Sequence, residues 1–226
     1  VQFKDVLKRM RQDSTILALG LPTELGQTPK FINYLGLNLT AAQIQHTYKF
    51  GIEHIDAEDR GALKAAGIDY QDVVAPIEVV QREDSKLFYV TLHLLIDGEA
   101  KDIFVQFEPE IADNGTFTLT DGEVSASIDQ YLSTPENGQE LYVHCSAGLG
   151  RTGIKLFAFF LLDHPEYLDS MDLILQGLQQ ARKDRRGLVQ NSRQLVNAVE
   201  LAAKMRAELD KRAQAKAPVS YTHLRA

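Results

Sequence analysis

Apolar and polar positions along the chain predict short strands, most of them placed before the long helices. In segments 86–95 and 101–107 apolar residues alternate with polar ones, and Asp97-Gly98 between them is a typical β-hairpin turn. Other short apolar runs predict strands: Thr15–Leu19, 30–34, 52–55, 77–80 and 141–143. Repeats of three and four residues predict helices: 40–50, Asp121–Leu132, Arg151–Asp163, 170–183 and 191–211. This order predicts an α/β fold, a twisted mixed β-sheet flanked by helices.

Length and composition predict a single domain. With 226 residues, of which 44% are hydrophobic, the chain can bury one sizeable core. We assign residues 1–216 to this domain, because residues 217–226 break the charged helical pattern before them and are expected to be a non-native tail. The chain begins with Val1 rather than methionine, so the question of a removed segment stays open.

Charge and cysteine content exclude several classes of protein. The net charge of −7 argues against nonspecific binding to nucleic acid, and no apolar run approaches the length of a membrane span. A single cysteine excludes an intramolecular disulfide and a cysteine-rich zinc site. A group of basic residues is either a solvated helix end or a local attraction for a phosphorylated ligand. Its members are Arg182, Lys183, Arg185, Arg186 and Arg193.

The stretch from His144 to Gly153 carries the clearest chemical signal. It contains the only cysteine, Cys145, then small residues, then Arg151. The strand expected at 141–143 precedes it and the expected helix follows it. A loop between a strand and a helix N-terminus presents free backbone N–H groups and the positive end of the helix dipole. The backbone of this loop therefore predicts an anion-binding site.

The side chains of the loop predict what such a site does with an anion. Gly148 and Gly150 allow the backbone to curl around the anion without Cβ clashes. The same field stabilises a thiolate, so we expect the pKa of Cys145 to lie well below the free-cysteine value of about 8.5. Arg151 can grip two phosphoryl oxygens with its planar fork, and Thr152 puts a hydroxyl near the sulfur.

Two other interpretations of Cys145 are weaker. A lone cysteine is often a small buried hydrophobe, but the residues around this one favour chemistry. A cysteine–histidine protease pair needs convergent side chains, whereas those of the sequence neighbours His144 and Cys145 diverge. We therefore expect His144 to fix the loop rather than to act as a base.

The order His-Cys, five residues, Arg-Thr-Gly resembles the phosphate-binding loop of the cysteine-dependent protein tyrosine phosphatases. Every fixed position of that signature is filled between His144 and Gly153. Segment 187–195, Gly-Leu-Val-Gln-Asn-Ser-Arg-Gln-Leu, resembles the glutamine loop of the phosphotyrosine-specific branch, with Asn191 in place of its threonine. The resemblance implies a minimal or bacterial-type member of this branch, with the family's fold.

The resemblance also implies a role for each residue of the two loops. Cys145 would be the nucleophile, Arg151 would bind the phosphoryl group, and Thr152 would stabilise the departing thiolate. Gln190 would position the water that hydrolyses the phosphoenzyme, and Gln194 would hold it during the first step. The phosphoryl oxygens would be bound by the remaining loop residues: Ser146, Ala147, Gly148, Leu149 and Gly150. No metal and no cofactor is expected, because the loop and the arginine supply the positive charge.

The general acid is expected in segment 111–116. This stretch, Ile-Ala-Asp-Asn-Gly-Thr, resembles the family's acid loop, Trp-Pro-Asp-x-Gly-x-Pro, which would make Asp113 the proton donor. The tryptophan and both prolines are missing, and the chain has no tryptophan anywhere. A surface turn of Asp-Asn-Gly is the other interpretation. The competing acids are Glu108, Glu110 and Asp121.

Weaker similarities extend the resemblance over most of residues 1–212. Near the start, Phe-Lys-Asp-Val is similar to the phosphotyrosine-recognition loop, with Phe3 stacking on the substrate and Asp5 bonding its backbone. Further on, Asp-Arg-Gly-Ala-Leu-Lys resembles a loop in which Asp59 would hold the signature arginine and Lys64 would approach the acid loop.

The function implied by the resemblance is hydrolysis of phosphotyrosine in proteins through a phosphocysteine intermediate. Its partners would be phosphotyrosine-containing proteins or peptides. Dual-specificity and phosphoinositide phosphatases share the chemistry, but the former lack the glutamine loop and the latter usually carry lysines inside the signature loop. The altered acid loop favours another alternative, a phosphotyrosine-binding module with weak or no catalysis. The expected location is the cytoplasm, or a host cytoplasm reached as a secreted effector, and the oligomeric state is open.

Overall fold

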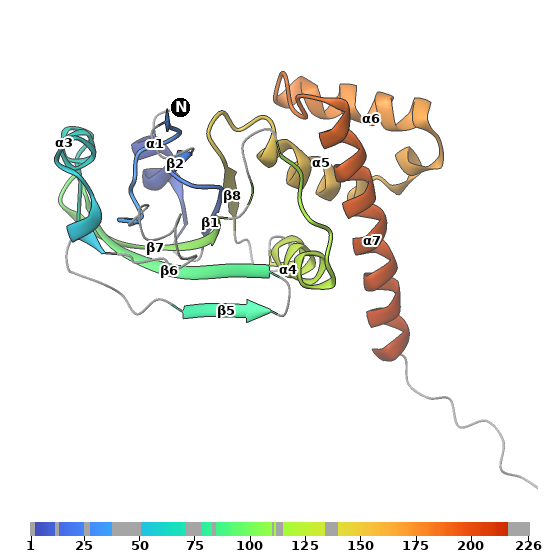
Figure 1. Ribbon diagram of the computed structural model, residues 1–226, viewed down its shortest axis with the longest axis horizontal. Coiled ribbons are helices and arrows are strands. Elements are labelled where there is room, and N and C mark those ends of the chain that lie inside the picture. Colours follow the sequence, from blue (N-terminus) through green and yellow to red (C-terminus); the bar gives the residue numbers. More distant parts are fainter. Residues whose placement is uncertain are drawn as a thin grey trace, which may run out of the picture.

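A mixed β-sheet forms the centre of the molecule (Figure 1). The computed structural model describes residues 3–11, 14–24, 28–37, 51–70, 78–82, 85–109, 111, 115–133 and 140–216. The sheet has six strands in the order β4-β6-β7-β1-β8, with β5 also paired to β6. These strands are β1 (Thr15–Leu19), β4 (Ile68–Tyr70), β5 (Glu78–Arg82), β6 (Ser85–Ile96), β7 (Glu99–Glu108) and β8 (Leu141–His144). Because β1 is parallel to β7 and β8 while β6 is antiparallel to its neighbours, the sheet is mixed as predicted.

The predicted hairpin joins β6 to β7. Its register brings Ile96 opposite Glu99 across the turn at Asp97 and Gly98. Both turn residues have positive φ, 53° and 88°, as a two-residue hairpin of the primed type requires. The aspartate–glycine pair therefore sets the register between β6 and β7, the two longest strands.

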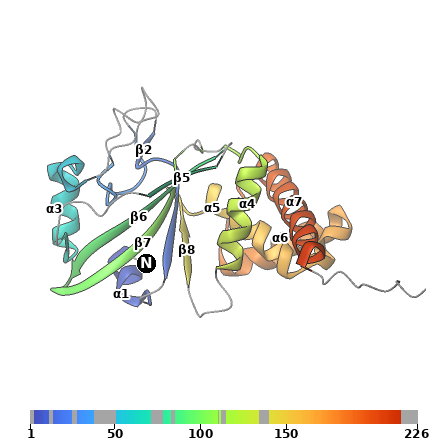
Figure 2. The ribbon, with the colours of Figure 1, turned by 90° about the horizontal axis from the view of Figure 1, so that it is seen from below.

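Helices cover the two sides of β1 (Figures 1 and 2). They are α1 (Phe3–Arg9), α3 (Ala57–Ala65), α4 (Asp121–Leu132), α5 (Arg151–Asp163), α6 (Met171–Asp184) and α7 (Ser192–Lys216). Leu17 and Leu19 of β1 pack into a core with α4, α5, α6 and α7, whereas Ile16 and Ala18 pack into a second core with α1 and α3. The alternation of side chains along one strand thus serves both cores. Shorter elements are η1 (Ile52–His54), η2 (Pro165–Asp169), and a separate pair of strands, β2 (Thr23–Glu24) and β3 (Thr28–Pro29).

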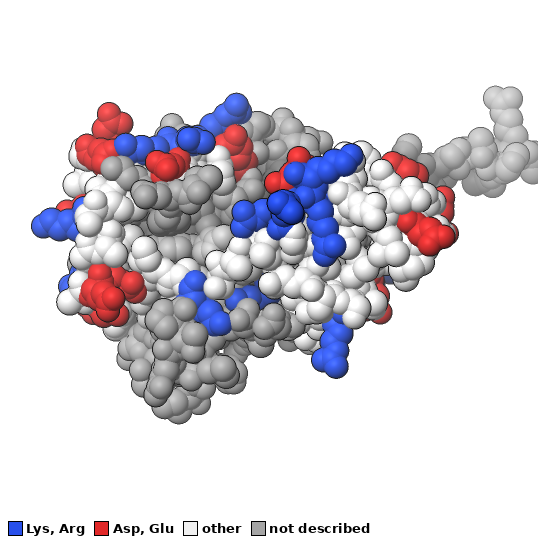
Figure 3. Space-filling model, turned by 90° about the horizontal axis from the view of Figure 1, so that it is seen from above, with Lys and Arg blue, Asp and Glu red and all other residues white. Residues whose placement is uncertain are grey.

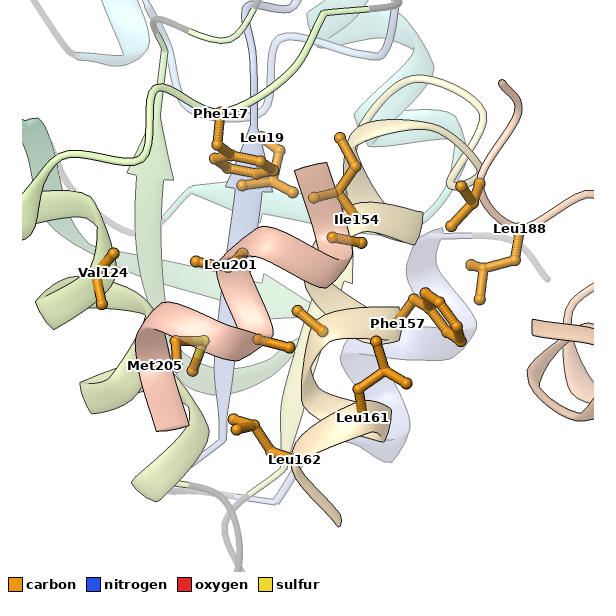
Figure 4. Packing of buried hydrophobic residues seen from close by; sticks show 14 of the residues in the cluster. Leu19, Phe117, Val124, Ile154, Phe157, Leu161, Leu162, Leu188, Leu201 and Met205 are labelled. Carbon is orange, nitrogen blue, oxygen red and sulfur yellow. The ribbon is translucent and has the colours of Figure 1, made fainter. Parts of the chain in front are cut away.

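Figure 4 shows how α7 is packed between α4 and α5 in the larger core. Ile154, Phe157 and Leu161 of α5 are fully buried, as the three- and four-residue repeat predicted. Val124 of α4 and Leu201 of α7 belong to the same core. The apolar face of the helix that follows the cysteine loop is therefore fixed against α7.

The predicted helix bounds agree closely with the structure. Helices 121–132 and 151–163 are confirmed at both ends. In α6 the side chain of Ser170 accepts a hydrogen bond from the Leu173 amide, so this serine is the N-cap and the helix begins one residue later than predicted. Helix α7 continues to Lys216.

Two predicted strands are wrong. Segment 30–34 bends instead, because the Asn33 side chain bonds both the amide and the carbonyl of Leu37, at 2.9 and 3.0 Å, and local bonds of this kind compete with strand pairing. Segment 52–55 forms a 3-10 turn with Ile55 N bonded to Ile52 O at 3.1 Å. The two isoleucines are three residues apart, which is the repeat of this helix.

Some predictions fall outside the described residues, namely the helix at 40–50 and the tail at 217–226. Near the start, Phe3–Arg9 is a helix where the resemblance implied a loop. The helix is stabilised by burial of Leu7 against the sheet and by Asp5 in its first turn, where acidic residues are favoured. Within the described ranges, no helix is long and apolar enough to cross a membrane.

Candidate active site

The cysteine loop connects β8 to α5, as predicted. Cys145 follows the last residue of the strand, and Gly150 is the N-cap of the helix, whose first intrahelical bond runs from Ile154 N to Gly150 O at 3.0 Å. Gly148 has a φ of 67°, a conformation that residues with a Cβ rarely adopt. The loop therefore turns sharply with its amides near a helix N-terminus, the arrangement that binds anions.

The Cys145 thiol lies in an environment that favours its ionised form. Burial by itself raises its pKa, but hydrogen bonds from the hydroxyl and amide of Thr152 and the amide of Gly148, with the charge of Arg151, lower the pKa overall. Thr152 Oγ1 is buried and has no nitrogen or oxygen partner among the described residues, so the sulfur is the acceptor that it faces. Because the thiolate is the nucleophilic form of cysteine, this environment favours nucleophilic attack by Cys145.

Arg151 reaches across the site toward the segment expected to supply the acid. It is 1% exposed, and its Nη1 donates to the carbonyl of Ile111 at 2.9 Å. Ile111 lies two residues before Asp113 in the sequence. The backbone just before the expected acid is therefore fastened to the signature arginine.

His144 supports the loop from behind the cysteine. Its Nδ1 lies 3.1 Å from the Cys145 carbonyl and its Nε2 lies 2.6 Å from the Tyr34 hydroxyl. Burial lowers the pKa of His144, so the ring is neutral near pH 7. A carbonyl only accepts, so the proton sits on Nδ1 and the tyrosine donates to Nε2. The Tyr34 carbonyl in turn accepts from the Tyr70 hydroxyl, which ties the loop to strand β4.

The two glutamines lie over Gly150. A Cβ on this glycine would come within 2.6 Å of Gln190 Oε1 and 2.8 Å of Gln194 Nε2. Gln194 Oε1 accepts from the backbone of Gln190 at 2.9 Å, while its Nε2 is buried without a partner among the described residues. Asn191, which replaces the family's threonine, caps α7 by accepting from Gln194 N at 2.9 Å. The structure thus brings both predicted glutamines to the cysteine loop, where Gln194 Nε2 remains available as a hydrogen-bond donor.

The glutamine loop is docked onto the cysteine loop through backbone bonds. Val189 N donates to Leu149 O at 2.9 Å, and Val189 has a φ of 60°, which is strained for a branched residue. Arg182 holds this conformation by donating to the carbonyls of Leu188 and Val189, at 2.8 and 2.7 Å. The close approach also needs Gly153, because a Cβ there would lie 2.6 Å from Val189 N.

The basic group around the α6–α7 turn supports the neighbouring loops and ends a solvated helix, while its attraction for a phosphorylated ligand stays a prediction. Arg185 is exposed, yet its Nη2 donates to Ala147 O at 2.8 Å and so braces the outside of the cysteine loop. Lys183 bonds Gln180 in its own helix, as a solvated helix end would. Arg186 and Arg193 are exposed, and Figure 3 shows Lys and Arg side chains gathered on this end of the molecule.

Among the acids, one competitor is already occupied. Glu108 is 5% exposed and accepts hydrogen bonds from Gln130 and Lys155, so it is not placed to protonate a leaving group. Asp121 is exposed in the first turn of α4. Asp113 and Glu110 lie outside the described residues, and the choice of Asp113 stays a prediction.

The remaining predicted residues have other contacts or none. Asp59 Oδ2 accepts a hydrogen bond from the backbone N–H of Asn33 at 3.0 Å, and Lys64 is exposed. Ser146 Oγ donates to the Lys30 carbonyl at 3.1 Å, which ties the loop to the segment before Phe31. The Phe3 side chain is outside the described part of the chain, and Asp5 is half-buried in α1. Their predicted roles stay untested.

Sequence reasoning missed three supports of the site. Tyr34 holds His144, the Ile111 carbonyl holds Arg151, and Lys155 is buried in a charged cluster behind the loop. Only Lys155 left a signal, since it is the one ionised side chain inside the apolar run between Ile154 and Leu162. The other two arise from contacts between distant segments, which a local pattern does not encode.

Comparison with known proteins agrees with this geometry. A model of the protein-tyrosine phosphatase family matches residues 122–204. No curated protein matches the sequence. The solved structure of the Trypanosoma cruzi phosphatase TcPTP1 is similar, with 19% identity over 92% of this chain and a TM-score of 0.55. That of Trypanosoma brucei TbPTP1 has 16% identity over 94% of this chain and a TM-score of 0.56.

A human relative extends the comparison. The catalytic domain of human protein tyrosine phosphatase non-receptor type 18 has 17% identity over 85% of this chain and a TM-score of 0.54. At these identities the likeness shows the fold. This chain spans less than two thirds of each of the three solved chains, 64%, 65% and 60% of their lengths in the order given. The matched segment, residues 122–204, holds the cysteine loop, Arg151 and both glutamines, so this part of the chain is similar to the protein-tyrosine phosphatase family, whose fold the three solved structures share with it.

Proposed function

We propose that the protein hydrolyses phosphotyrosine in proteins through a phosphocysteine intermediate. The observation that carries the proposal is the environment of Cys145, a thiol whose pKa is lowered by the amides of the loop, the Thr152 hydroxyl and the charge of Arg151 at a helix N-terminus. A phosphotyrosine substrate is further supported by PTPN18, a similar structure that was crystallised with a HER2 phosphopeptide. The uncharged loop residues between Cys145 and Arg151 favour a substrate with a single phosphate.

In the first step, the Cys145 thiolate attacks phosphorus in line with the bond to the phenolic oxygen. The S–P bond forms as the P–O bond breaks, and the loop amides with Arg151 hold the equatorial oxygens. Asp113 gives its proton to the phenolate, so tyrosine leaves neutral. The Arg151 bond to Ile111 supports this assignment, because it keeps the residues before Asp113 near the phosphoryl group.

In the second step, water attacks the phosphorus of phosphocysteine. Asp113, now ionised, takes a proton from the water, the S–P bond breaks, and Thr152 donates to the departing thiolate. Gln190 positions the water. Its side chain and that of Gln194 lie over Gly150, at the mouth of the loop, which supports this role.

The test is a panel of phosphopeptides of one sequence that carry phosphotyrosine, phosphoserine or phosphothreonine, together with p-nitrophenyl phosphate. Release of phosphate from the phosphotyrosine peptide and from p-nitrophenyl phosphate, and not from the other two peptides, is the expected result. Cys145→Ser is the control and should release none. Comparable turnover of all three peptides would instead indicate a dual-specificity phosphatase.

The altered acid loop keeps a second function in view, a phosphotyrosine-binding module. The missing tryptophan and prolines of that loop are the observation that favours it. Phosphotyrosine peptide that binds to the wild-type protein without any Cys145-dependent turnover would establish this second function and reject the first.

A further inference from the structure

Lys155 is buried in a cluster of polar side chains behind the cysteine loop. Its side chain is 0% exposed, and a buried ammonium is costly unless it is paired and hydrogen-bonded. All of its hydrogen bonds go to α4 and the end of β7. Its Nζ lies 2.5 Å from Glu123 Oε1, 2.7 Å from Ser127 Oγ, 3.3 Å from Gln130 Oε1 and 3.4 Å from Glu108 Oε1.

The charges of this cluster nearly compensate one another. Burial disfavours the Lys155 ammonium, but the carboxylates of Glu108 and Glu123 outweigh burial and hold its pKa above the ordinary value. Burial and the Glu108 charge in turn raise the pKa of Glu123 to about 7. Apolar residues of similar volume often fill such a space with equal or greater stability, so the cluster needs a reason other than filling the core.

The partners of Lys155 come from both sides of the segment that carries the expected acid. Glu108 is the last residue of β7, before that segment. Phe117 lies after it, and its ring centroid is 4.5 Å from Lys155 Nζ, within range of a cation–π contact. One ammonium on α5 therefore contacts the two ends of the chain that flank Asp113.

Side chains of α5 and α7 also bond the backbone on both sides of the acid segment. The Ile111 carbonyl accepts from Arg151 at 2.9 Å. Phe117 is bracketed by Asn197, which accepts from its amide at 2.8 Å and donates to its carbonyl at 3.0 Å. Asn197 lies on α7, the helix that carries Gln194. The flanks of the acid segment are thus held against both helices of the site.

We propose that Lys155 is a positioning residue, which places the acid segment for protonation of the leaving group. This inference rests on the proposed function. By holding Glu108 and Phe117 against the helix of Arg151, Lys155 fixes the two chain segments that precede and follow the expected acid relative to the cysteine loop. It touches neither substrate nor sulfur, and its effect is transmitted through Glu108 and Phe117.

A residue that only filled the core would lower stability and slow every substrate alike. A residue that positions the acid affects a substrate in proportion to its need for a proton. Phenyl phosphate releases a strongly basic phenolate and needs the acid, whereas 2,4-dinitrophenyl phosphate releases a stable anion and hardly needs it. The ratio of turnover between these substrates therefore separates the two roles.

The experiment measures kcat/KM, which reports formation of phosphocysteine, for both substrates in Lys155→Met, in Asp113→Ala and in the double variant. Lys155→Met should lower kcat/KM for phenyl phosphate by about tenfold or more and for the dinitrophenyl ester by about threefold or less. In the Asp113→Ala background, Lys155→Met should change kcat/KM for phenyl phosphate by no more than about twofold, since there is no acid left to position. Leu161→Ala, a buried change farther along α5, is the control for lost stability and should leave the ratio between substrates unchanged.

If Lys155→Met does not fold, Lys155→Met/Glu123→Gln is measured instead, because it avoids leaving two carboxylates unpaired. Equal losses for both substrates, or a Lys155→Met loss that persists in full without Asp113, would overturn the inference while leaving the proposed function in place. Wild-type protein without Cys145-dependent turnover of either substrate would overturn the proposed function and the inference with it.

Discussion

Two sites on helix α5 lie one turn apart and treat charge in opposite ways. At its N-terminus, hydrogen-bond donors gather around Cys145: the amides of Gly148 and Thr152, the Arg151 guanidinium, and Gln194 Nε2, which has no partner among the described residues. One turn later, Lys155 is surrounded by acceptors from Glu123, Ser127 and Glu108. A surplus of donors binds an anionic ligand, whereas a compensated cluster binds nothing and fixes geometry. The comparison therefore separates the residues that act from those that position them.

The largest effect should come from removing the nucleophile. Cys145→Ser replaces a thiolate by a hydroxyl that does not ionise near neutral pH, so turnover of the phosphotyrosine peptide should fall by roughly 10³-fold or more. The donors of the loop are unchanged, and the variant should still bind the peptide in a calorimetric titration. Residual hydrolysis within tenfold of wild type would contradict the covalent mechanism.

The next effect concerns the acid. Asp113→Ala should lower turnover of aryl phosphates by roughly 10²–10⁴-fold, the usual contribution of general acid catalysis. In the pH profile of kcat/KM, the acidic limb from ionisation of Cys145 should remain while the basic limb flattens. Asp113→Asn provides a matched control of size.

Full activity in Asp113→Ala, with a loss in Glu110→Gln or Asp121→Asn, would show that the acid segment is aligned wrongly. The match of residues 122–204 to the protein-tyrosine phosphatase family model would not change.

A smaller effect is expected where the glutamines meet the loop. The Cβ of Gly150→Ala would displace the ends of Gln190 and Gln194, which are flexible, so the fold should tolerate it. The water that hydrolyses phosphocysteine would be misplaced, so kcat for phenyl phosphate should fall by roughly 10–100-fold. Phenol should be released in a burst before the slow hydrolysis of phosphocysteine. Gly61→Ala on α3 is the control, because nothing lies within 4 Å of its Cβ. Unchanged kcat in Gly150→Ala would remove the glutamines from the second step.

The smallest effect concerns the cluster of Lys155, Glu108 and Glu123, which should make the free energy of unfolding depend on pH. Glu123, with a pKa raised to about 7 by burial and by Glu108, keeps a proton in the folded state that an unfolded glutamate of pKa 4.5 has lost. The folded state then binds more protons between these values, so the free energy of unfolding should fall as pH rises from 4.5 to about 7. Lys155 also faces Glu123 and favours its ionised form. The free energy of unfolding should therefore fall by only about 1–3 kcal/mol over this pH range.

Urea unfolding at several pH values measures this fall. Glu123→Gln should abolish the part that Glu123 contributes, and Glu58→Gln, an exposed change on α3, should leave it in place. Equal pH dependence in Glu123→Gln and wild type would show that Glu123 is ionised throughout this range.

The sequence predicted the cysteine loop better than the polar cluster around Lys155, for a physical reason. The cysteine, the glycines, the arginine and the helix after them lie in one continuous segment, so their pattern is visible in the sequence, and Asp97-Gly98 likewise fixes its hairpin locally. The glutamines were found only through the resemblance, since their approach to Gly150 joins segments far apart in the chain.

The positioning contacts are long-range and leave little local pattern. Glu108 and Glu123 are indistinguishable from surface charges in the sequence, and only the folded chain brings them to Lys155. The strand predicted at 30–34 failed for a related reason, because the Asn33 side chain competes with strand pairing through local bonds. Apolar pattern thus predicted the helices of the larger core, while polar side chains decided where the pattern failed.

The central claim is that the excess of donors at the cysteine loop serves a phosphoryl group bound to Cys145. Acid quenching during turnover of a phosphotyrosine peptide, followed by mass spectrometry of the peptide fragment that holds Cys145, tests this directly. We expect a phosphate adduct on Cys145 that accumulates further in Gly150→Ala and is absent from Cys145→Ser. Turnover that proceeds with no adduct on Cys145 in either the wild-type protein or Gly150→Ala would contradict it.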